Sequence, residues 1–286
     1  MAPVLDLRPS PIAGRWYPDD PRRLADSVDA YLHQASLPEI PGDVIAVMTP
    51  HAGHMYSGKV AGHAFAALQG LRPEVVAVVS PMHYLSPYSV LTSAHEGYAT
   101  PLGELLIDRQ MLNDIHQDME RSLGFGLTPV RNDQEHSLEI ELPFLQRSLK
   151  GEFRLLPVMV RDPDPEIAQA LGAALAKALS GRNALLVAST DLSHGYPQAA
   201  AEILDTEIMR RVEDLDPAGV LLAEQQGKGF ACGRGALAAV LWAALGLGAN
   251  AARVLNYATS GAVTGDYFQV VGYASAAIYR KCGEQS

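Results

Sequence analysis

The chain has 286 residues and a formal net charge of −10, so it lacks the basic surface that tracks a phosphate backbone, and we expect no nucleic-acid binding. Its two cysteines are too few for a disulfide-stabilised secreted scaffold and fit a reducing compartment.

The N-terminus, Met1–Asp6, lacks the basic and apolar regions of a signal peptide. The most apolar stretch, Leu237–Leu247, is too short to span a bilayer. No linker, low-complexity tract or repeat divides the chain. We therefore expect a soluble cytoplasmic protein with one domain over residues 1–286, and no membrane association.

Short apolar runs alternate along the chain with amphipathic segments. In chain order, the predicted elements are a helix from Pro21, a strand at 44–48, a helix through Val60, Ala64 and Leu68, a strand at 75–79, a helical stripe from Leu138 to Leu149, a strand at 153–160, a helix from Pro165, a strand at 184–188, helices over 203–215, from Pro217 and over 236–245, and strands at 253–257 and 268–278. This alternation predicts an α/β/α sandwich around a mostly parallel or mixed sheet.

Local signals refine these elements. Asp-Pro pairs at 20–21, 164–165 and 216–217 are typical of a helix N-cap followed by its first residue. Ser57 is a candidate cap for the helix that carries Val60, and Pro143 is expected to kink or restart the helix in which it lies. Gly272 predicts a bulge or a close backbone approach in the last strand.

Three predicted strands are each followed within a few residues by a histidine: His51, His83 and His194. The carboxyl ends of parallel strands meet at one edge of a sheet, where the ligand crevice of such folds lies. A single histidine in this position is more often a structural hydrogen-bonding residue. Three of them at the same edge predict a metal site or an acid/base site.

Other polar positions have two interpretations each. Asp191 either supports His194 as a general base or caps the next element. His136 lies in a polar run, 132–139, that fits a site or a solvated helix start. Cys232 precedes an apolar helix, whose dipole favours a thiolate, although its spacing alone indicates a small buried residue. We expect Cys282 to be an incidental exposed thiol.

A hydroxyl-rich loop lies between the last two predicted strands and could line a pocket for a polar ligand. It contains Thr259, Ser260 and Asp266, and it lacks the lysine that follows the glycines of a phosphate-binding loop. The chain also contains neither the Gly-x-Ser-x-Gly motif of hydrolases nor the His-Glu-x-x-His motif of zinc proteases.

Segments along nearly the whole chain resemble the Memo family, the B component of the AmmeMemoRadiSam system in bacteria and archaea. The matching segments are Arg8-Pro9, Ala13-Gly14-Arg15-Trp16-Tyr17-Pro18, Pro50-His51-Ala52-Gly53, Tyr56-Ser57-Gly58, Pro81-Met82-His83, Glu135-His136-Ser137-Leu138-Glu139, Leu142-Pro143, Thr190-Asp191-Leu192-Ser193-His194, Cys232-Gly233-Arg234, Tyr257-Ala258-Thr259-Ser260-Gly261 and Thr264-Gly265-Asp266-Tyr267. That family is similar in fold to the class III extradiol dioxygenases, in which two histidines and a glutamate hold Fe(II) and a further histidine acts as acid/base.

The resemblance implies roles for single residues. His51 and His83 would be metal ligands, and Cys232 would stand at the place of the dioxygenase glutamate. His194 would be the acid/base residue, supported by Asp191. The substrate pocket would contain His54, Tyr56, His136, Thr259, Ser260 and Asp266.

Three positions depart from the family pattern. His54 stands where an aromatic residue is usual, Met82 where serine is usual, and Tyr84 where a second histidine often follows. A thiolate ligand is also softer than a carboxylate, which shifts the metal preference from iron toward copper or zinc.

We therefore expect an oxidoreductase that uses Fe(II) or copper and acts on an unidentified small molecule or peptide. The alternatives are a zinc hydrolase, in which His194 deprotonates a metal-bound water, and a non-catalytic protein that binds a peptide or the radical-SAM and AMMECR-like proteins of the same system.

Overall fold

The computed structural model describes residues 5–282, so residues 1–4, on which the signal-peptide prediction partly rests, lie outside it. Within this range a nine-stranded mixed sheet has the order β10-β12-β2-β9-β3-β8-β4-β7, and β11 also pairs with β12. Its strands are β2 (Gly42–Thr49), β3 (Val75–Pro81), β4 (Val90–Ser93), β7 (Thr128–Val130), β8 (Arg154–Val160), β9 (Ala184–Ser189), β10 (His194–Tyr196), β11 (Ala251–Thr259) and β12 (Val270–Lys281).

The four central strands, β2, β9, β3 and β8, are all parallel. β12 runs antiparallel to β2, and β4 runs antiparallel to β8. Every residue of β3 is buried, which explains why its sequence is a continuous apolar run rather than an alternating one. A separate small sheet consists of β1 (Leu7–Arg8), β5 (Gly97–Thr100) and β6 (Gly103–Leu106).

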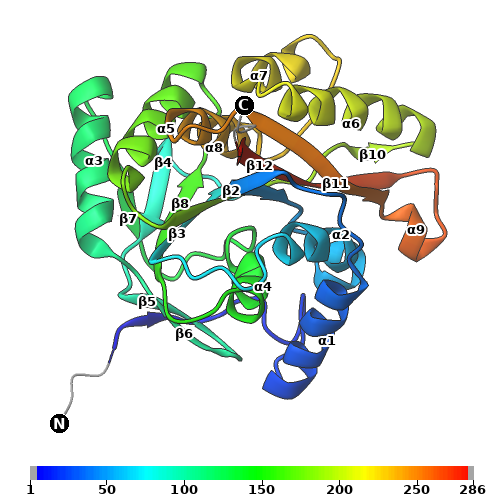
Figure 1. Ribbon diagram of the computed structural model, residues 1–286, viewed down its shortest axis with the longest axis horizontal. Coiled ribbons are helices and arrows are strands. Elements are labelled where there is room, and N and C mark those ends of the chain that lie inside the picture. Colours follow the sequence, from blue (N-terminus) through cyan, green and yellow to red (C-terminus); the bar gives the residue numbers. More distant parts are fainter. Residues whose placement is uncertain (1–4, 283–286) are drawn as a thin grey trace.

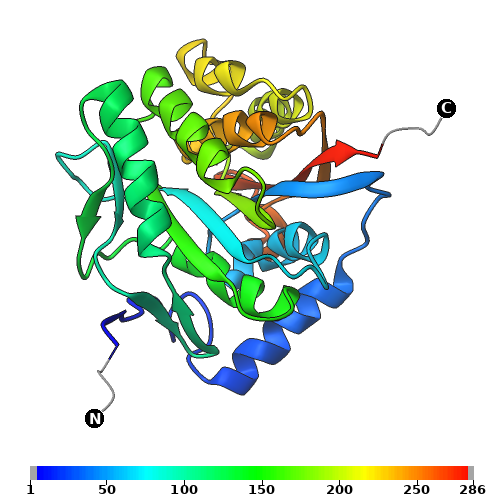
Figure 2. The same ribbon diagram turned by 60° about the vertical axis from the view of Figure 1, so that its left-hand side comes forward.

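Helices cover both faces of the large sheet (Figure 1). One face carries α1 (Pro21–Gln34), α2 (His54–Ala66) and α4 (Leu142–Ser148), the last preceded by the 3-10 turn η1 (Glu139–Glu141). The other face carries α3 (Arg109–Leu123), α5 (Pro165–Leu179), α6 (Gln198–Glu213), α7 (Pro217–Gln225) and α8 (Arg234–Gly246). In both views α1 lies outside α2, which packs on β2 and β12 (Figure 2). The short α9 (Gly261–Thr264) lies between β11 and β12.

The predicted α/β/α sandwich with its mixed sheet is confirmed. Each predicted strand is present, and Asp20, Asp164 and Asp216 cap α1, α5 and α7 by accepting backbone N–H bonds. The close approach predicted at Gly272 is also confirmed, because a Cβ there would lie 1.8 Å from Oδ2 of Asp205. Pro143 marks a restart, since η1 gives way to α4 one residue before it.

The cap predicted at Ser57 is wrong. α2 begins three residues earlier, at His54, with Gly53 as its N-cap. Ser57 therefore lies inside the helix, where its hydroxyl donates to the carbonyl oxygen of Ala52. None of the helices between residues 5 and 282 is both long and apolar enough to cross a membrane.

Candidate metal centre

The carboxyl ends of three neighbouring strands define the centre. β9 lies between β2 and β3, and Thr49 at the end of β2 pairs with Ser189 at the end of β9. The chain leaves these strands toward His51, Asp191 and His83. The topology thus brings together side chains that are far apart in the sequence, at the edge where the crevice of an open parallel sheet is expected.

Three histidines converge at this edge: His51, His83 and His136 each offer one ring nitrogen, and these atoms all lie within 4.8 Å of one another. The ring centroid of His51 lies 5.2 Å from that of His83 and 5.5 Å from that of His136. The rings of His83 and His136 are stacked, with their centroids 4.9 Å apart. His51 is buried, whereas the side chain of His83 is 34% exposed. The cluster is therefore reachable from solvent on one side.

One buried carboxylate, Glu135, lies close to two of the three rings. Its Oε1 lies 3.0 Å from Nδ1 of His83 and 3.3 Å from Nδ1 of His136. The backbone N–H groups of His83, His136 and Ser137 also donate to it, at 2.5, 2.9 and 2.9 Å. Burial would raise the pKa of Glu135, but the hydrogen bond from His83 and those from the amides outweigh burial and lower it. With its Nδ1 hydrogen-bonded to Glu135, the His83 ring has Nε2 free for a metal.

The loop that carries Glu135 and His136 is fixed by a buried arginine from the N-terminal strand. Nη1 of Arg8 donates to Oε2 of Glu139 at 2.6 Å, and Nη2 donates to Oδ1 of Asp133 at 2.8 Å and to the carbonyl oxygen of Glu135 at 2.7 Å. Burial alone would lower the pKa of Arg8, but these acidic partners raise it, so the guanidinium stays charged. Through Arg8, β1 thus helps to position His136, one of the three histidines of the cluster.

His51 has a different set of partners. Its backbone N–H donates to Oδ1 of Asp191 at 2.8 Å, and a hydrogen bond of 2.9 Å joins Nδ1 to Oγ of Ser189. Burial lowers the pKa of His51 well below its ordinary value, and burial lowers that of His136 to about 4. Both rings are therefore neutral near pH 7, which is the form that binds a metal.

Cys232 lies at the N-terminal end of α8, beside the cluster. Its Sγ is 3.2 Å from Nε2 of His51 and accepts a hydrogen bond of 3.3 Å from the backbone N–H of Asp191. Burial raises the pKa of this thiol, with a further contribution from the Asp191 carboxylate. Burial thus outweighs the helix dipole that favours a thiolate, and without metal Cys232 is a protonated thiol.

Asp191 and His194 both line the pocket, but their carboxyl and imidazole groups have separate partners. Burial raises the pKa of Asp191 to about 7. Nδ1 of His194 donates to the carbonyl oxygen of Leu192 at 2.8 Å, and burial lowers the pKa of His194. The support that we expected His194 to receive from Asp191 thus comes from a backbone carbonyl, while Asp191 contacts His51.

A cavity of about 450 Å³ opens above the histidines. It is lined by the three histidines together with Arg15, Trp16, Ala52, Gly53, Tyr56, Asp191, His194, Val271 and Tyr273. The ring of Trp16 lies 4.1 Å from that of His136 and forms part of the wall. Tyr56 and His136 are pocket residues that the family resemblance implies. Trp16, Glu135 and Ser189 are members of the site that were not predicted, although Trp16 and Glu135 belong to the segments that resemble the Memo family.

The structure places the other expected pocket residues elsewhere. His54 is packed among Tyr17, Tyr31 and Phe144, with Nε2 3.1 Å from the carbonyl oxygen of Ile140. Thr259 at the end of β11 and the polar residues of the loop that follows have partners outside the pocket. Thr259 donates to Gln198, Ser260 accepts from the amide of Val271, and Asp266 accepts from the amide of Phe268.

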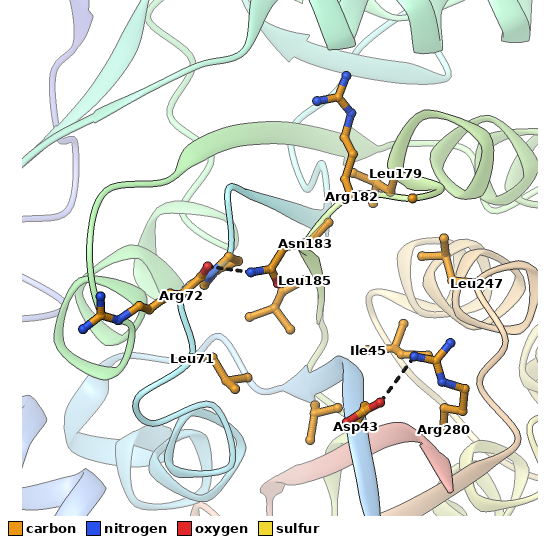
Figure 3. Close-up of a pocket in the computed structure, with 14 residues that line it drawn as sticks. Asp43, Ile45, Leu71, Arg72, Leu179, Arg182, Asn183, Leu185, Leu247 and Arg280 are labelled. Atoms are coloured by element: carbon orange, nitrogen blue, oxygen red, sulfur yellow. Dashed lines mark hydrogen bonds and ion pairs between the residues drawn. The ribbon is translucent and has the colours of Figure 1, made fainter. Parts of the chain in front are cut away.

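A second cavity, of about 490 Å³, lies at the amino-terminal ends of β2 and β9 (Figure 3). Arg280 on its wall pairs with Asp43 at 3.3 Å. The guanidinium groups of Arg72 and Arg182 point away from its centre in Figure 3. No histidine lines this cavity. The chemistry-bearing side chains are thus gathered at the opposite, carboxyl-terminal edge of the sheet.

The comparison with known families agrees with the order of these motifs. The model of the Memo-like protein family matches residues 8–277. The chain belongs to the Memo-like family. A MEMO1 family protein from Methanopyrus kandleri is 35% identical over 283 residues, covering 94% of this chain and 98% of that protein. A second one, from Nitrosopumilus maritimus, is 30% identical over 273 residues, covering 94% and 98% of the two chains.

The solved structure of an uncharacterized protein from Escherichia coli K12 aligns with a TM-score of 0.46 and 15% identity, covering 81% of this Memo-like chain and 99% of that one.

Proposed function

We propose that this Memo-like protein is an oxidoreductase that uses iron or copper bound at the histidine cluster. The observation that carries this proposal is the convergence of His51, His83 and His136, whose ligand nitrogens lie within 4.8 Å of one another below an open cavity. Imidazole is a good ligand for iron, copper and zinc, and the neutral rings of His51 and His136 need lose no proton to bind.

Cys232 is proposed as a further ligand that joins when the metal binds. Its Sγ lies 3.2 Å from Nε2 of His51, so a metal on that nitrogen would be within reach of the sulfur. Metal binding would displace the thiol proton, because the thiolate is the ligand form. A soft sulfur beside imidazoles favours copper more than a carboxylate would.

The other residues of the pocket have proposed roles around the metal, which would supply one-electron chemistry. His194 is neutral, and the bond from its Nδ1 to Leu192 leaves Nε2 as the atom that can accept a substrate proton. Trp16, Tyr56 and Tyr273 form aromatic walls that suit the apolar part of a small molecule or a peptide.

The decisive experiment is anaerobic purification, reconstitution with Fe(II), Cu(I) or Zn(II), metal analysis and O₂ consumption. We expect stoichiometric binding and O₂ uptake with iron or copper. His51→Ala and His83→Ala should abolish tight binding and keep the fold, as shown by circular dichroism. His33→Ala, at an exposed position on α1, is the control and should bind normally.

Two outcomes would contradict the proposal. Hydrolytic activity with zinc and no O₂ uptake with any metal would favour a hydrolase. No metal binding combined with tight binding of a partner protein would favour a non-catalytic binding protein.

A further inference from the structure

The hydroxyl of Ser189 lies at the base of the metal centre, between His51 and Glu141. Ser189 is fully buried at the end of β9. Its Oγ lies 2.7 Å from the carbonyl oxygen of Ser137, 2.8 Å from Oε1 of Glu141 and 2.9 Å from Nδ1 of His51. Three hydrogen-bonding neighbours thus surround one hydroxyl group.

The number of protons available restricts the hydrogen bonds that Ser189 can make with these three neighbours. A hydroxyl donates one hydrogen bond and accepts two, and a backbone carbonyl can only accept. If Glu141 were ionised, it and the carbonyl of Ser137 would compete for the single proton of Ser189. The losing oxygen would then face a lone pair at 2.7 or 2.8 Å in a buried site, which is costly.

One arrangement satisfies every group. Ser189 donates to the carbonyl of Ser137 and accepts two bonds, one from a protonated Glu141 and one from the Nδ1–H of His51. The other oxygen of Glu141, Oε2, accepts from the hydroxyl of Thr49 at 3.3 Å, as the carbonyl oxygen of a neutral acid does.

We propose that Glu141 is a neutral carboxylic acid and that, through Ser189, it holds His51 as the Nδ1–H tautomer, with Nε2 free for the metal. Glu141 and Ser189 are then positioning residues that contact neither metal nor substrate. The part of this inference that concerns metal affinity rests on the proposed function.

The surroundings of Glu141 support its neutral state. The residue is 1% exposed, and no lysine or arginine within residues 5–282 forms a salt bridge with it. Burial raises its pKa well above the ordinary value, and the nearby Asp191 carboxylate adds to this effect. The tautomer also agrees with the opposite side of the ring, where an unprotonated Nε2 can accept from the thiol of Cys232 at 3.2 Å.

Infrared spectroscopy of the metal-free protein tests the state of Glu141. The difference spectrum between wild type and Glu141→Gln at neutral pH should contain the carbonyl stretch of a protonated carboxylic acid. Asp191 is present in both proteins, so its contribution cancels. A carboxylate band in place of the acid band would overturn the assignment.

Heteronuclear NMR of the His51 ring nitrogens, again without metal, tests the tautomer. We expect Nδ1–H in wild type and in Glu141→Gln, because the amide of glutamine can donate to Ser189 as the acid does. Ser189→Ala should lose this preference. The matched control is Ser275→Ala, since Ser275 is equally buried in the same sheet and its hydroxyl has no partner. An Nε2–H tautomer in wild type would overturn the proposal.

Metal titration then separates a neutral Glu141 from an anionic one. Loss of a residue that orients a ligand weakens metal binding roughly 10- to 100-fold, and this is expected for Ser189→Ala. Glu141→Gln should stay within about 3-fold of wild type, a small effect beside that range. A loss in Glu141→Gln as large as in Ser189→Ala would show that the charge of Glu141 matters and would overturn the neutral assignment. If neither wild type nor the variants bind metal, the proposed function fails, while the infrared and NMR results still stand.

Discussion

Sγ of Cys232 lies 3.2 Å from Nε2 of His51, although the two residues are 181 positions apart in the chain. The contact joins the end of β2 to the start of α8. In the absence of metal the two groups are a thiol and a neutral imidazole, which can share a hydrogen bond.

We expect the alkylation of Cys232 to report on metal binding. In metal-free Cys282→Ser protein it should be slow at neutral pH and accelerate as the pH rises, because burial raises the pKa of the thiol and the thiolate is the reacting form. Bound metal should suppress it, as measured by mass spectrometry. The exposed Cys282, followed in Cys232→Ala protein, is the control and should react equally with and without metal. Equal rates for Cys232 in the two states would remove it from the site.

Glu135→Gln should weaken metal binding roughly 10- to 100-fold, the usual cost of losing a residue that orients metal-binding histidines. The amide cannot accept all the bonds that the carboxylate receives from His83, His136 and Ser137. Calorimetric titration measures the affinity, with Glu104→Gln at an exposed position of β6 as a control. Unchanged affinity in Glu135→Gln would mean that the metal does not bind through these two rings.

His54→Phe should flatten the pH dependence of stability. Burial lowers the pKa of His54 to about 4, whereas an unfolded histidine titrates near about 6.5. Between these values the unfolded state binds one more proton, so the stabilisation present above about pH 6.5 is lost as the pH falls toward about 4. The full loss amounts to about 3 kcal/mol.

The free energies of unfolding of wild type and His54→Phe are measured in urea at several pH values. At neutral pH the two proteins should differ by less than about 2 kcal/mol, since phenylalanine gives up one hydrogen bond but also removes a buried Nδ1 that has no partner. Below about pH 4, where the full loss is reached, His54→Phe should be more stable than wild type. His33→Gln, at an exposed site, should follow wild type throughout. Parallel curves for His54→Phe and wild type would contradict the prediction.

Arg8→Ala should destabilise the fold by about 3–5 kcal/mol, because it leaves the buried Glu139 and the partly buried Asp133 without their cation. The free energy of unfolding in urea measures this effect. Arg210→Ala removes a comparable pair of contacts from the surface of α6 and should cost no more than about 1 kcal/mol. Similar losses of unfolding free energy in both variants would show that the Arg8 network stabilises the fold no more than a surface ion pair does.

The sequence predicted the central sheet well because its strands are buried on both faces and therefore read as uninterrupted apolar runs. The strand-end argument likewise found His51 and His83, which follow two of these strands directly. Residues 85–131 gave no such signal, since β4, β5, β6 and β7 have four residues or fewer. The predicted site also lacked Ser189, whose importance depends on its three neighbours in space.

His136 shows the limit of local reasoning most clearly. It lies in a loop without regular structure, and no strand or helix fixes it. Its position depends on Arg8, which binds the carbonyl oxygen of the preceding Glu135 from 127 residues away. A pairing of this kind arises only in three dimensions, so the sequence could indicate a polar segment but not the third member of the cluster.

The proposed ligands come from distant parts of the chain, so a metal bound by them would have a second effect. His51, His83 and His136 come from three separate loops, and the shortest span between two of them, from His51 to His83, crosses α2 and β3. An unfolded chain therefore holds no compact chelating segment. An ion bound here fastens distant parts of the molecule to one point, and its binding energy adds to the free energy of unfolding. In the proposed metal-bound protein, a chelator is therefore expected to lower the free energy of unfolding by this contribution and to leave the metal-free chain folded.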